Sequence, residues 1–201
     1  MRNSVTALLL VASAVALSAA IATRGRIGHP VTPRMQTEAK AVAGRATASL
    51  LAQGSNGRTY ALGKSDRGRP RVLIFIKSDC PCSEAAEPCF ARLHAAYRDR
   101  ADLLGIIAGD LPVAKDWVSR HQTPYPVLAD PDLKAIQALG AERSAYTALV
   151  NPDGTIEHLW PGYSAGMLKD LAQRLADLTK TAVASLDVGE APQELTSGCP
   201  F

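Results

Sequence analysis

Residues 71–89 read RVLIFIKSDCPCSEAAEPC and decide the fold. The first seven residues of this stretch are mostly β-branched or aromatic, without alternating polar positions, which predicts a strand buried on both faces. Cys80 and Cys82 follow this strand, and residues 81–97 carry the pattern of a helix, with Pro81 suited to its first position. The stretch therefore predicts two thiols where a buried strand ends and a helix begins.

Strands and helices alternate along the rest of the chain. Upstream, residues 50–62 hold two short apolar pieces around a Ser-Asn-Gly turn, which predicts a β-hairpin. Because strands that alternate with helices form parallel sheets, and the last two strands form a hairpin, we expect an α/β fold ordered as hairpin, βαβα and ββα around a mixed sheet. The further strands are predicted at 103–108, 126–129, 147–150 and 156–160, and the helices at 114–121, 133–139 and 165–178.

Composition and charge limit the possible functions. The chain has 201 residues, of which 47% are hydrophobic and 20% charged, as in a globular protein with one main domain. The net charge is +3, but residues 1–45 alone carry +5, so the remainder is mildly acidic. A nucleic-acid-binding domain needs a basic face, and we therefore expect no nucleic-acid partner.

The two ends of the chain differ from the domain between them. Residues 5–22 hold no charge, which predicts that residues 1–23 are a signal peptide or a single membrane anchor. Residues 24–45 are predicted to be a linker, residues 46–185 the folded domain, and residues 186–201 a mobile tail that carries Cys199. We expect an exported or membrane-anchored protein whose domain is extracytoplasmic, in the periplasm.

Cys80 is the candidate nucleophile. A thiol at a helix start lies near exposed backbone amides and the positive end of the helix dipole, and both favour the thiolate. The neighbouring carboxylates oppose this effect, and Lys77 would offset them if it turned toward the sulfur. The hypothesis requires a Cys80 sulfur that is acidic and reachable from solvent.

Three other cysteines are candidate resolving thiols, which would form a disulfide with Cys80. Cys82 is only two residues away, a spacing that permits a strained bridge. Cys199, in the tail, would reach Cys80 or Cys89 if the tail folded back. Cys89 is seven residues from Cys82 on one helix, about 10 Å at 1.5 Å per residue, too far for a bridge between those two. We expect Cys82 to resolve, with Cys199 as the alternative.

These residues resemble the thioredoxin-like superfamily, and within it the redoxin branch of alkyl hydroperoxide reductase and thiol-specific antioxidant (AhpC/TSA) proteins. Phe75 lies five residues before Cys80, as the family's strand phenylalanine does, and Pro88 lies where thioredoxins place a helix proline. The segments LLGIIAGD and TALVNPDGTIEHLWPG are similar to further segments of the branch. The resemblance implies a three-layer thioredoxin-like sandwich and thiol redox chemistry.

The chain departs from the family at several positions. Ser83 stands where thioredoxins have their second cysteine, and Tyr146 stands at the position of their cis-proline. Peroxiredoxins orient peroxide with a threonine and an arginine, and here the corresponding positions hold Lys77 and Ala145. Arg143 and Thr147 are near enough in sequence to Ala145 to substitute for these groups.

The function predicted from these residues is thiol–disulfide oxidoreductase. Cys80 would attack a disulfide or hydroperoxide substrate, Cys82 would resolve the product, and a thioredoxin-like donor would reduce the resulting bridge. No organic cofactor or metal is required. The alternatives are a peroxiredoxin-type peroxidase resolved by Cys199, and a copper(I) chaperone that binds the metal through Cys80 and Cys82.

Overall fold

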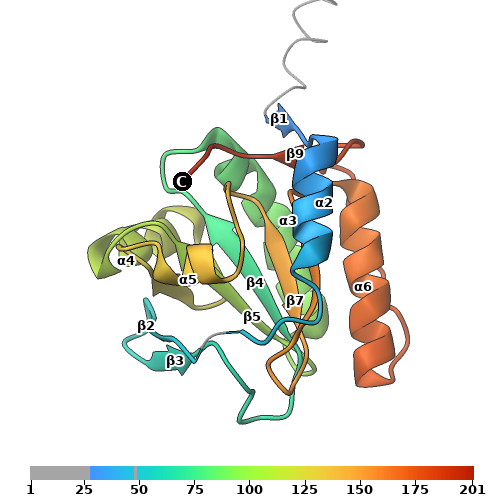
Figure 1. Cartoon of the computed structure of the whole chain (residues 1–201), viewed down its shortest axis with the longest axis horizontal. Coiled ribbons are helices and arrows are strands. Elements are labelled where there is room, and N and C mark those ends of the chain that lie inside the picture. The colour runs from blue at the N-terminus through green and yellow to red at the C-terminus, as the bar shows by residue number, and fades with distance from the viewer. Residues whose placement is uncertain (1–27, 48) are drawn as a thin grey trace, which may run out of the picture.

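A five-stranded mixed sheet forms the centre of the protein (Figure 1). The computed structural model describes residues 28–47 and 49–201. The three parallel strands β6, β5 and β4 are joined by the antiparallel strands β7 and β8, which confirms the predicted mixed α/β sheet. In sheet order the strands are β6 (Val127–Ala129), β5 (Asp102–Ile107), β4 (Arg71–Ile76), β7 (Thr147–Val150) and β8 (Ile156–Trp160).

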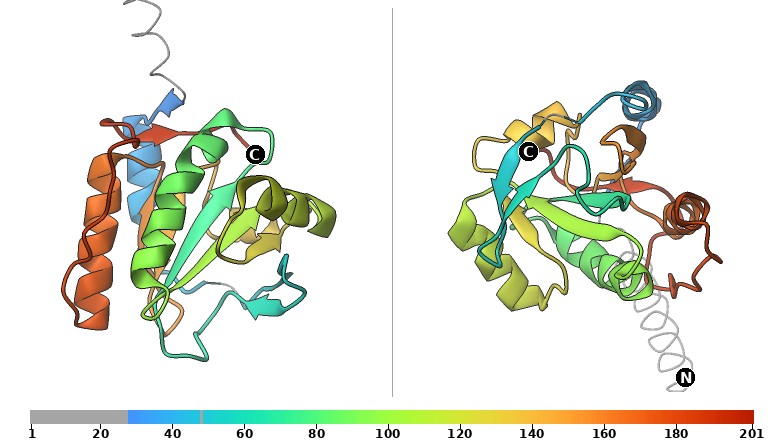
Figure 2. Two further views of the ribbon diagram at one scale, coloured as in Figure 1. Left: turned by 180° about the vertical axis from the view of Figure 1, so that it is seen from behind. Right: turned by 90° about the horizontal axis from the view of Figure 1, so that it is seen from below.

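Helices cover both faces of this sheet, because its central strand is apolar on both sides (Figures 1 and 2). On β4, Val72 and Ile74 pack in the core with helices α3, α4 and α6, whereas Leu73 and Phe75 pack with α2 and α5. The result is a three-layer sandwich. The helices are α2 (Pro33–Ala41), α3 (Pro81–Tyr97), α4 (Leu111–His121), α5 (Lys134–Ala138) and α6 (Ala165–Thr179).

The predicted hairpin is present at residues 50–62 as a small separate sheet. It consists of β2 (Leu51–Gln53) and β3 (Thr59–Ala61). One bridge, between Gly54 and Leu128, connects it to the edge strand β6. The hairpin therefore extends the fold beside the central sheet.

The prediction of a linker at residues 24–45 is wrong for its second half. Residues 33–41 form α2, whose N-cap Thr32 accepts a hydrogen bond from the Met35 amide at 3.3 Å. Met35 and Ala39 are buried against the sheet, four residues apart on one face of the helix. A helix this short has too few apolar positions to show a clear period, so the pattern resembled a tether.

The C-terminal tail is folded onto the domain (Figure 2). After α6 it runs back along α3, where Arg92 donates to the Asp187 carbonyl at 2.9 Å. Its strand β9 (Thr196–Ser197) pairs with β1 (His29–Pro30). The expectation of a mobile tail is not met in this conformation.

The apolar run at residues 5–22 lies outside the described residues, as does the predicted signal or anchor at 1–23. Within residues 28–47 and 49–201, no helix has the length and hydropathy needed to cross a membrane.

Candidate active site

Cys80 lies at the junction of strand β4 and helix α3, as predicted. It is the N-cap residue of α3, with φ −105° and ψ 115°, and its carbonyl accepts from the Ser83 amide at 2.9 Å. Pro81 occupies the first turn of the helix, where the absence of its amide hydrogen costs nothing. Cys80 therefore lies at the start of the helix, and its side chain makes no capping hydrogen bond to the first turn.

Two groups from distant parts of the chain donate hydrogen bonds to the Cys80 sulfur. The Ser144 hydroxyl, in the loop before β7, lies 3.2 Å from Sγ. The backbone amide of Cys199, in the tail, lies 3.1 Å from it. Hydrogen bonds from neutral donors to a thiolate favour the ionised form.

The pKa of Cys80 falls from 9.0 to about 6, although burial by itself raises it. Hydrogen bonds from Cys199 and Ser144 outweigh the burial effect, and the nearby Ser83 amide, whose own hydrogen bond goes to the Cys80 carbonyl, adds to them. The predicted acidity is therefore present. Its causes include tertiary hydrogen bonds from Cys199 and Ser144, which the sequence analysis did not predict. Lys77 does not turn to the sulfur, since its Nζ donates to the Pro200 carbonyl at 2.7 Å.

Cys82 and Cys199 both lie against Cys80, and all four cysteines are reduced. Burial and the neighbouring Cys80 sulfur raise the pKa of Cys82 to about 12. The pKa of Cys199 is also raised, chiefly because its thiol donates a hydrogen bond to Cys80. At neutral pH the cluster therefore holds one thiolate between two protonated thiols.

Access to Cys80 contradicts the expectation of a reachable sulfur. The residue is 0% exposed, and the cover is the end of the chain, residues 196–201, which we call the C-terminal strap. The Cys199 amide lies 3.1 Å from the Cys80 sulfur, and Gly198 lies so near that a Cβ added to it would be 3.2 Å from the same sulfur. A substrate therefore reaches the sulfur only when the strap moves away.

Cys89 is not part of this cluster. Its sulfur accepts from Arg92 at 3.5 Å, on the side of α3 that faces residues 187–190. Burial raises the pKa of the Cys89 thiol. Its surroundings are those of a buried thiol with a local partner, and the structure gives no support to its predicted resolving role.

The loop before β7 supplies Ser144, which the sequence analysis did not identify as a site residue. Ala145 has φ +60°, a left-handed conformation that strains a residue with a side chain. Its amide donates to the Phe75 carbonyl at 2.8 Å, and the Phe75 amide donates to the Tyr146 carbonyl at 3.0 Å. These bonds hold the loop beside Cys80. The sequence signal for Ser144 was its position two residues before Tyr146, which stands where thioredoxins have their cis-proline.

Tyr146, Arg143 and Thr147 do not contact the Cys80 sulfur through hydrogen bonds. Tyr146 is buried, and its hydroxyl has no partner among the described residues. Arg143 donates to the Gly198 carbonyl of the strap at 3.0 Å. Thr147 lies in β7 opposite Ile74. Neither Arg143 nor Thr147 replaces the peroxide-orienting groups in this conformation.

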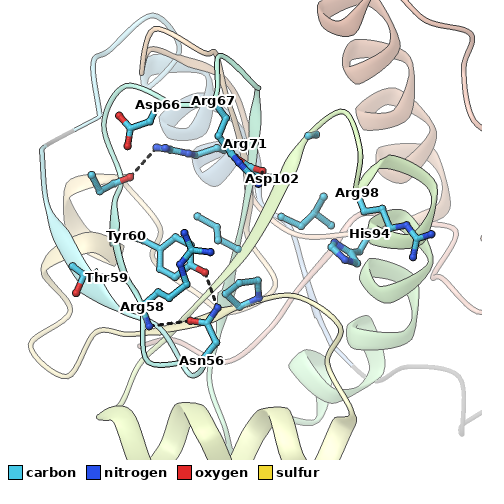
Figure 3. Close-up of a pocket in the computed structure, with 15 residues that line it drawn as sticks. Asn56, Arg58, Thr59, Tyr60, Asp66, Arg67, Arg71, His94, Arg98 and Asp102 are labelled. Atoms are coloured by element: carbon cyan, nitrogen blue, oxygen red, sulfur yellow. Dashed lines mark hydrogen bonds and ion pairs between the residues drawn. The ribbon is translucent and has the colours of Figure 1, made fainter.

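A cavity of about 420 Å³ lies away from these thiols, at the end of the sheet where β4 and β5 begin (Figure 3). None of the four cysteines lines it, whereas arginines do, and Arg71 in its wall donates to the carbonyls of Ala61 and Gly63.

Among residues 28–47 and 49–201, no group of three or more His, Cys, Asp or Glu side chains has the arrangement of a metal site.

Comparisons with known proteins agree with this fold. The thiol–disulfide oxidoreductase ResA of Halalkalibacterium halodurans is 24% identical over 115 residues, which cover 56% of this chain and 64% of ResA. The chain thus matches less than two thirds of that relative. The structure of MTB dsbF in mixed oxidized and reduced forms superposes with a TM-score of 0.58 at 23% identity, over 67% of this chain and 98% of dsbF.

A peroxide-reducing protein is similar as well. The bacterioferritin comigratory protein of Xanthomonas campestris gives a TM-score of 0.56 at 19% identity, over 65% of this chain and 92% of that protein. These likenesses confirm the predicted thioredoxin-like fold. The model of the AhpC/TSA family matches residues 43–159, more than half of the chain. The chain therefore belongs to the AhpC/TSA family.

Proposed function

We propose that the protein is a thiol–disulfide oxidoreductase whose nucleophile is Cys80. The observation that carries the proposal is the pair of donors on one sulfur, from Ser144 and Cys199, which lower the pKa of Cys80 to about 6. A thiolate is the form that attacks disulfides. At neutral pH this sulfur is ionised before substrate arrives.

The first step is attack of the Cys80 thiolate on one sulfur of a substrate disulfide. A bond forms between Cys80 and that sulfur, the substrate disulfide breaks, and the other sulfur leaves as a thiolate. In the second step a resolving thiol of this chain loses its proton to solvent and attacks Cys80. The substrate leaves with both sulfurs reduced, and the chain keeps an intramolecular disulfide.

We assign the resolving role to Cys199 in preference to the predicted Cys82. Cys199 is partly exposed, and its amide already lies 3.1 Å from the Cys80 sulfur. Cys82 is buried, and burial is the largest cause of its raised pKa, so few molecules carry the attacking thiolate. A bridge to Cys82 would also be strained by the two-residue spacing.

Partners and location follow from this chemistry and from the N-terminal sequence. An external dithiol protein of the thioredoxin type would reduce the Cys80–Cys199 bridge by a second exchange. The uncharged run at residues 5–22 supports export or membrane anchoring, which would place the domain outside the cytoplasm, where disulfides persist. The name of ResA, a thiol–disulfide oxidoreductase, supports the same chemistry.

Mixing the reduced protein with one equivalent of oxidised glutathione, followed by mass mapping, tests the assignment. The wild type should form a Cys80–Cys199 bridge and release two reduced glutathiones. Cys199→Ser should accumulate glutathione on Cys80, Cys80→Ser should not react, and the matched variant Cys89→Ser should behave as the wild type.

Three outcomes would contradict the proposal in different ways. Unchanged glutathione release by Cys80→Ser would remove Cys80 as the nucleophile. A Cys80–Cys82 bridge in the wild type would return the resolving role to Cys82. Oxidation of Cys80 by hydrogen peroxide much faster than by oxidised glutathione would favour the peroxidase alternative.

A further inference from the structure

The C-terminal strap is held in place at its start by backbone pairing. Thr196 and Tyr163 exchange two hydrogen bonds, of 2.9 and 3.0 Å, and Ser197 pairs with His29 in the β1–β9 ladder. Tyr163 and His29, with which the start of the strap pairs, are far apart in sequence. The strap is therefore a folded element with defined contacts.

The strap then runs antiparallel to residues 142–144, directly over Cys80. The Gly198 amide donates to the Ser144 carbonyl at 2.9 Å, and the Ser144 amide donates to the Cys199 carbonyl at 3.0 Å. Phe201 continues the pairing, since its amide donates to the Glu142 carbonyl at 3.3 Å. Such backbone bonds bind any extended polypeptide in this orientation, because they do not involve its side chains.

Two cations add contacts of the same kind. Lys77 Nζ donates to the Pro200 carbonyl at 2.7 Å, and an Arg143 nitrogen donates to the Gly198 carbonyl at 3.0 Å. Both bind main-chain oxygens. Neither side chain has a carboxylate partner among the salt bridges found in the described part of the chain.

Two positions of the strap have side-chain requirements. A Cβ at Gly198 would overlap the Ser144 hydroxyl and would lie 3.0 Å from the Ser144 carbonyl oxygen and 3.2 Å from the Cys80 sulfur, so any larger residue before the cysteine must displace the groups that bind Cys80. Phe201, two residues after the cysteine, lines a groove of about 550 Å³ between α2 and α5, with Val42, Ile136 and Ala141 among its walls. The site therefore accepts a glycine directly before the cysteine and an apolar side chain two positions after it.

We propose that the track from Lys77 over Ser144 to the α2–α5 groove binds an extended segment of a partner polypeptide that carries a cysteine, and that the C-terminal strap occupies it as an internal substrate mimic. This inference rests on the proposed function, because thiol–disulfide exchange at Cys80 is what would bring such a segment to the track. The strap excludes a substrate while docked. After a mixed disulfide forms, the strap displaces the substrate segment from the track, which brings Cys199 to Cys80. The preferred segment has glycine before its cysteine and a large apolar residue two positions after.

Alkylation of Cys80 by iodoacetamide, followed by mass spectrometry across a pH series, measures access in the full-length protein. Gly198→Ala should dislodge the strap and raise the rate at the high-pH plateau by about tenfold or more, because the accessible fraction rises. The plateau is used because losing the strap also raises the pKa of Cys80. Gly166→Ala is the matched control, since a Cβ there meets nothing closer than 3.8 Å.

Phe201→Ala provides a second way to release the strap without touching the sulfur, should Gly198→Ala fail to fold. It removes the side chain in the groove and should also raise the plateau rate. A plateau rate equal to that of the wild type in a folded Gly198→Ala or Phe201→Ala protein would overturn the assignment of the strap as a cover.

A peptide in trans tests the binding track itself. The hexapeptide Thr-Ser-Gly-Ser-Pro-Phe, which lacks a thiol, should slow alkylation of Cys80 in the Gly198→Ala protein, whereas Thr-Ser-Ala-Ser-Pro-Phe should not. Equal effects of the two peptides, or no protection by either, would overturn the substrate mimicry. Protection needs no redox turnover, so it stands or falls separately from the glutathione assay that tests the proposed function.

Discussion

Ser144 should control the acidity of Cys80. The Ser144 hydroxyl donates to the Cys80 sulfur at 3.2 Å in a buried site. A hydrogen bond to a charged group contributes about 1.5–3 kcal/mol, and one pKa unit equals about 1.4 kcal/mol. Ser144→Ala should therefore raise the pKa of Cys80 by roughly one to two from its value of about 6. At pH 7 the ionised fraction would fall from about nine-tenths to one half or less.

The same change should alter how stability depends on pH. Because folding lowers the pKa of Cys80 from 9.0 to about 6, its thiolate stabilises the folded state fully above pH 9, and this contribution is lost as the pH falls through 6. Ser144→Ala should reduce the increase in the free energy of unfolding between pH 6 and pH 9. The reduction should be about 1–2.5 kcal/mol, because the wild-type thiol is already half ionised at pH 6.

The assay is the pH dependence of Cys80 alkylation, with urea unfolding at pH 6 and pH 9 as the second measurement. Ser144→Thr keeps a hydroxyl and serves as the matched variant, which should recover much of the acidity. An unchanged midpoint for Cys80 in Ser144→Ala, with the strap still docked, would refute the view that this hydroxyl stabilises the thiolate.

Three further predictions concern residues near the site. Burial raises the pKa of Glu87, which accepts a hydrogen bond from Tyr125 at 2.6 Å. Because the folded state holds this proton more tightly than the unfolded state, the free energy of unfolding should fall as the pH rises from about 4.5. Urea titrations of Glu87→Gln should show this fall removed. Ala145→Gly should relieve the φ of +60° and raise the free energy of unfolding by about 0.5–1 kcal/mol, whereas a loss of stability in thermal melts would contradict a strained alanine. Cys89→Ala should leave the pH midpoint of Cys80 alkylation unchanged, because Cys89 bonds to Arg92, and a shifted midpoint would show that the two thiols interact.

Local patterns in the sequence were sufficient for most of the fold. The apolar run at 71–77 was long enough to indicate a strand buried on both faces, and the structure has β4 at Arg71–Ile76. The helix after it begins at Pro81, as its proline and its position after the strand indicated. Helix α2 was missed because its buried face consists of only two residues, Met35 and Ala39, within a segment rich in proline and charge.

The electrostatic basis of the site was only partly predictable. The sequence places Cys80 at a helix start, and that position alone indicates an acidic thiol. Further contributions come from the hydrogen bonds of Ser144 and Cys199, which are 64 and 119 residues away along the chain. A hydrogen bond across such separations depends on how the loop and the tail pack, and no local pattern encodes it.

The sequence by itself determined alternating strands and helices with a cysteine pair at the end of a buried strand, because hydrophobic periodicity and turn residues act over short distances. The thioredoxin-like sandwich was implied by the resemblance of these residues to a known family. Only the tertiary structure decided that a third thiol, Cys199, joins that pair and that the strap around it buries Cys80. The physical reason is that a chain end is positioned by the summed contacts of a whole surface, here β1, Tyr163, residues 142–144 and the α2–α5 groove, and these contacts exist only after the domain has folded.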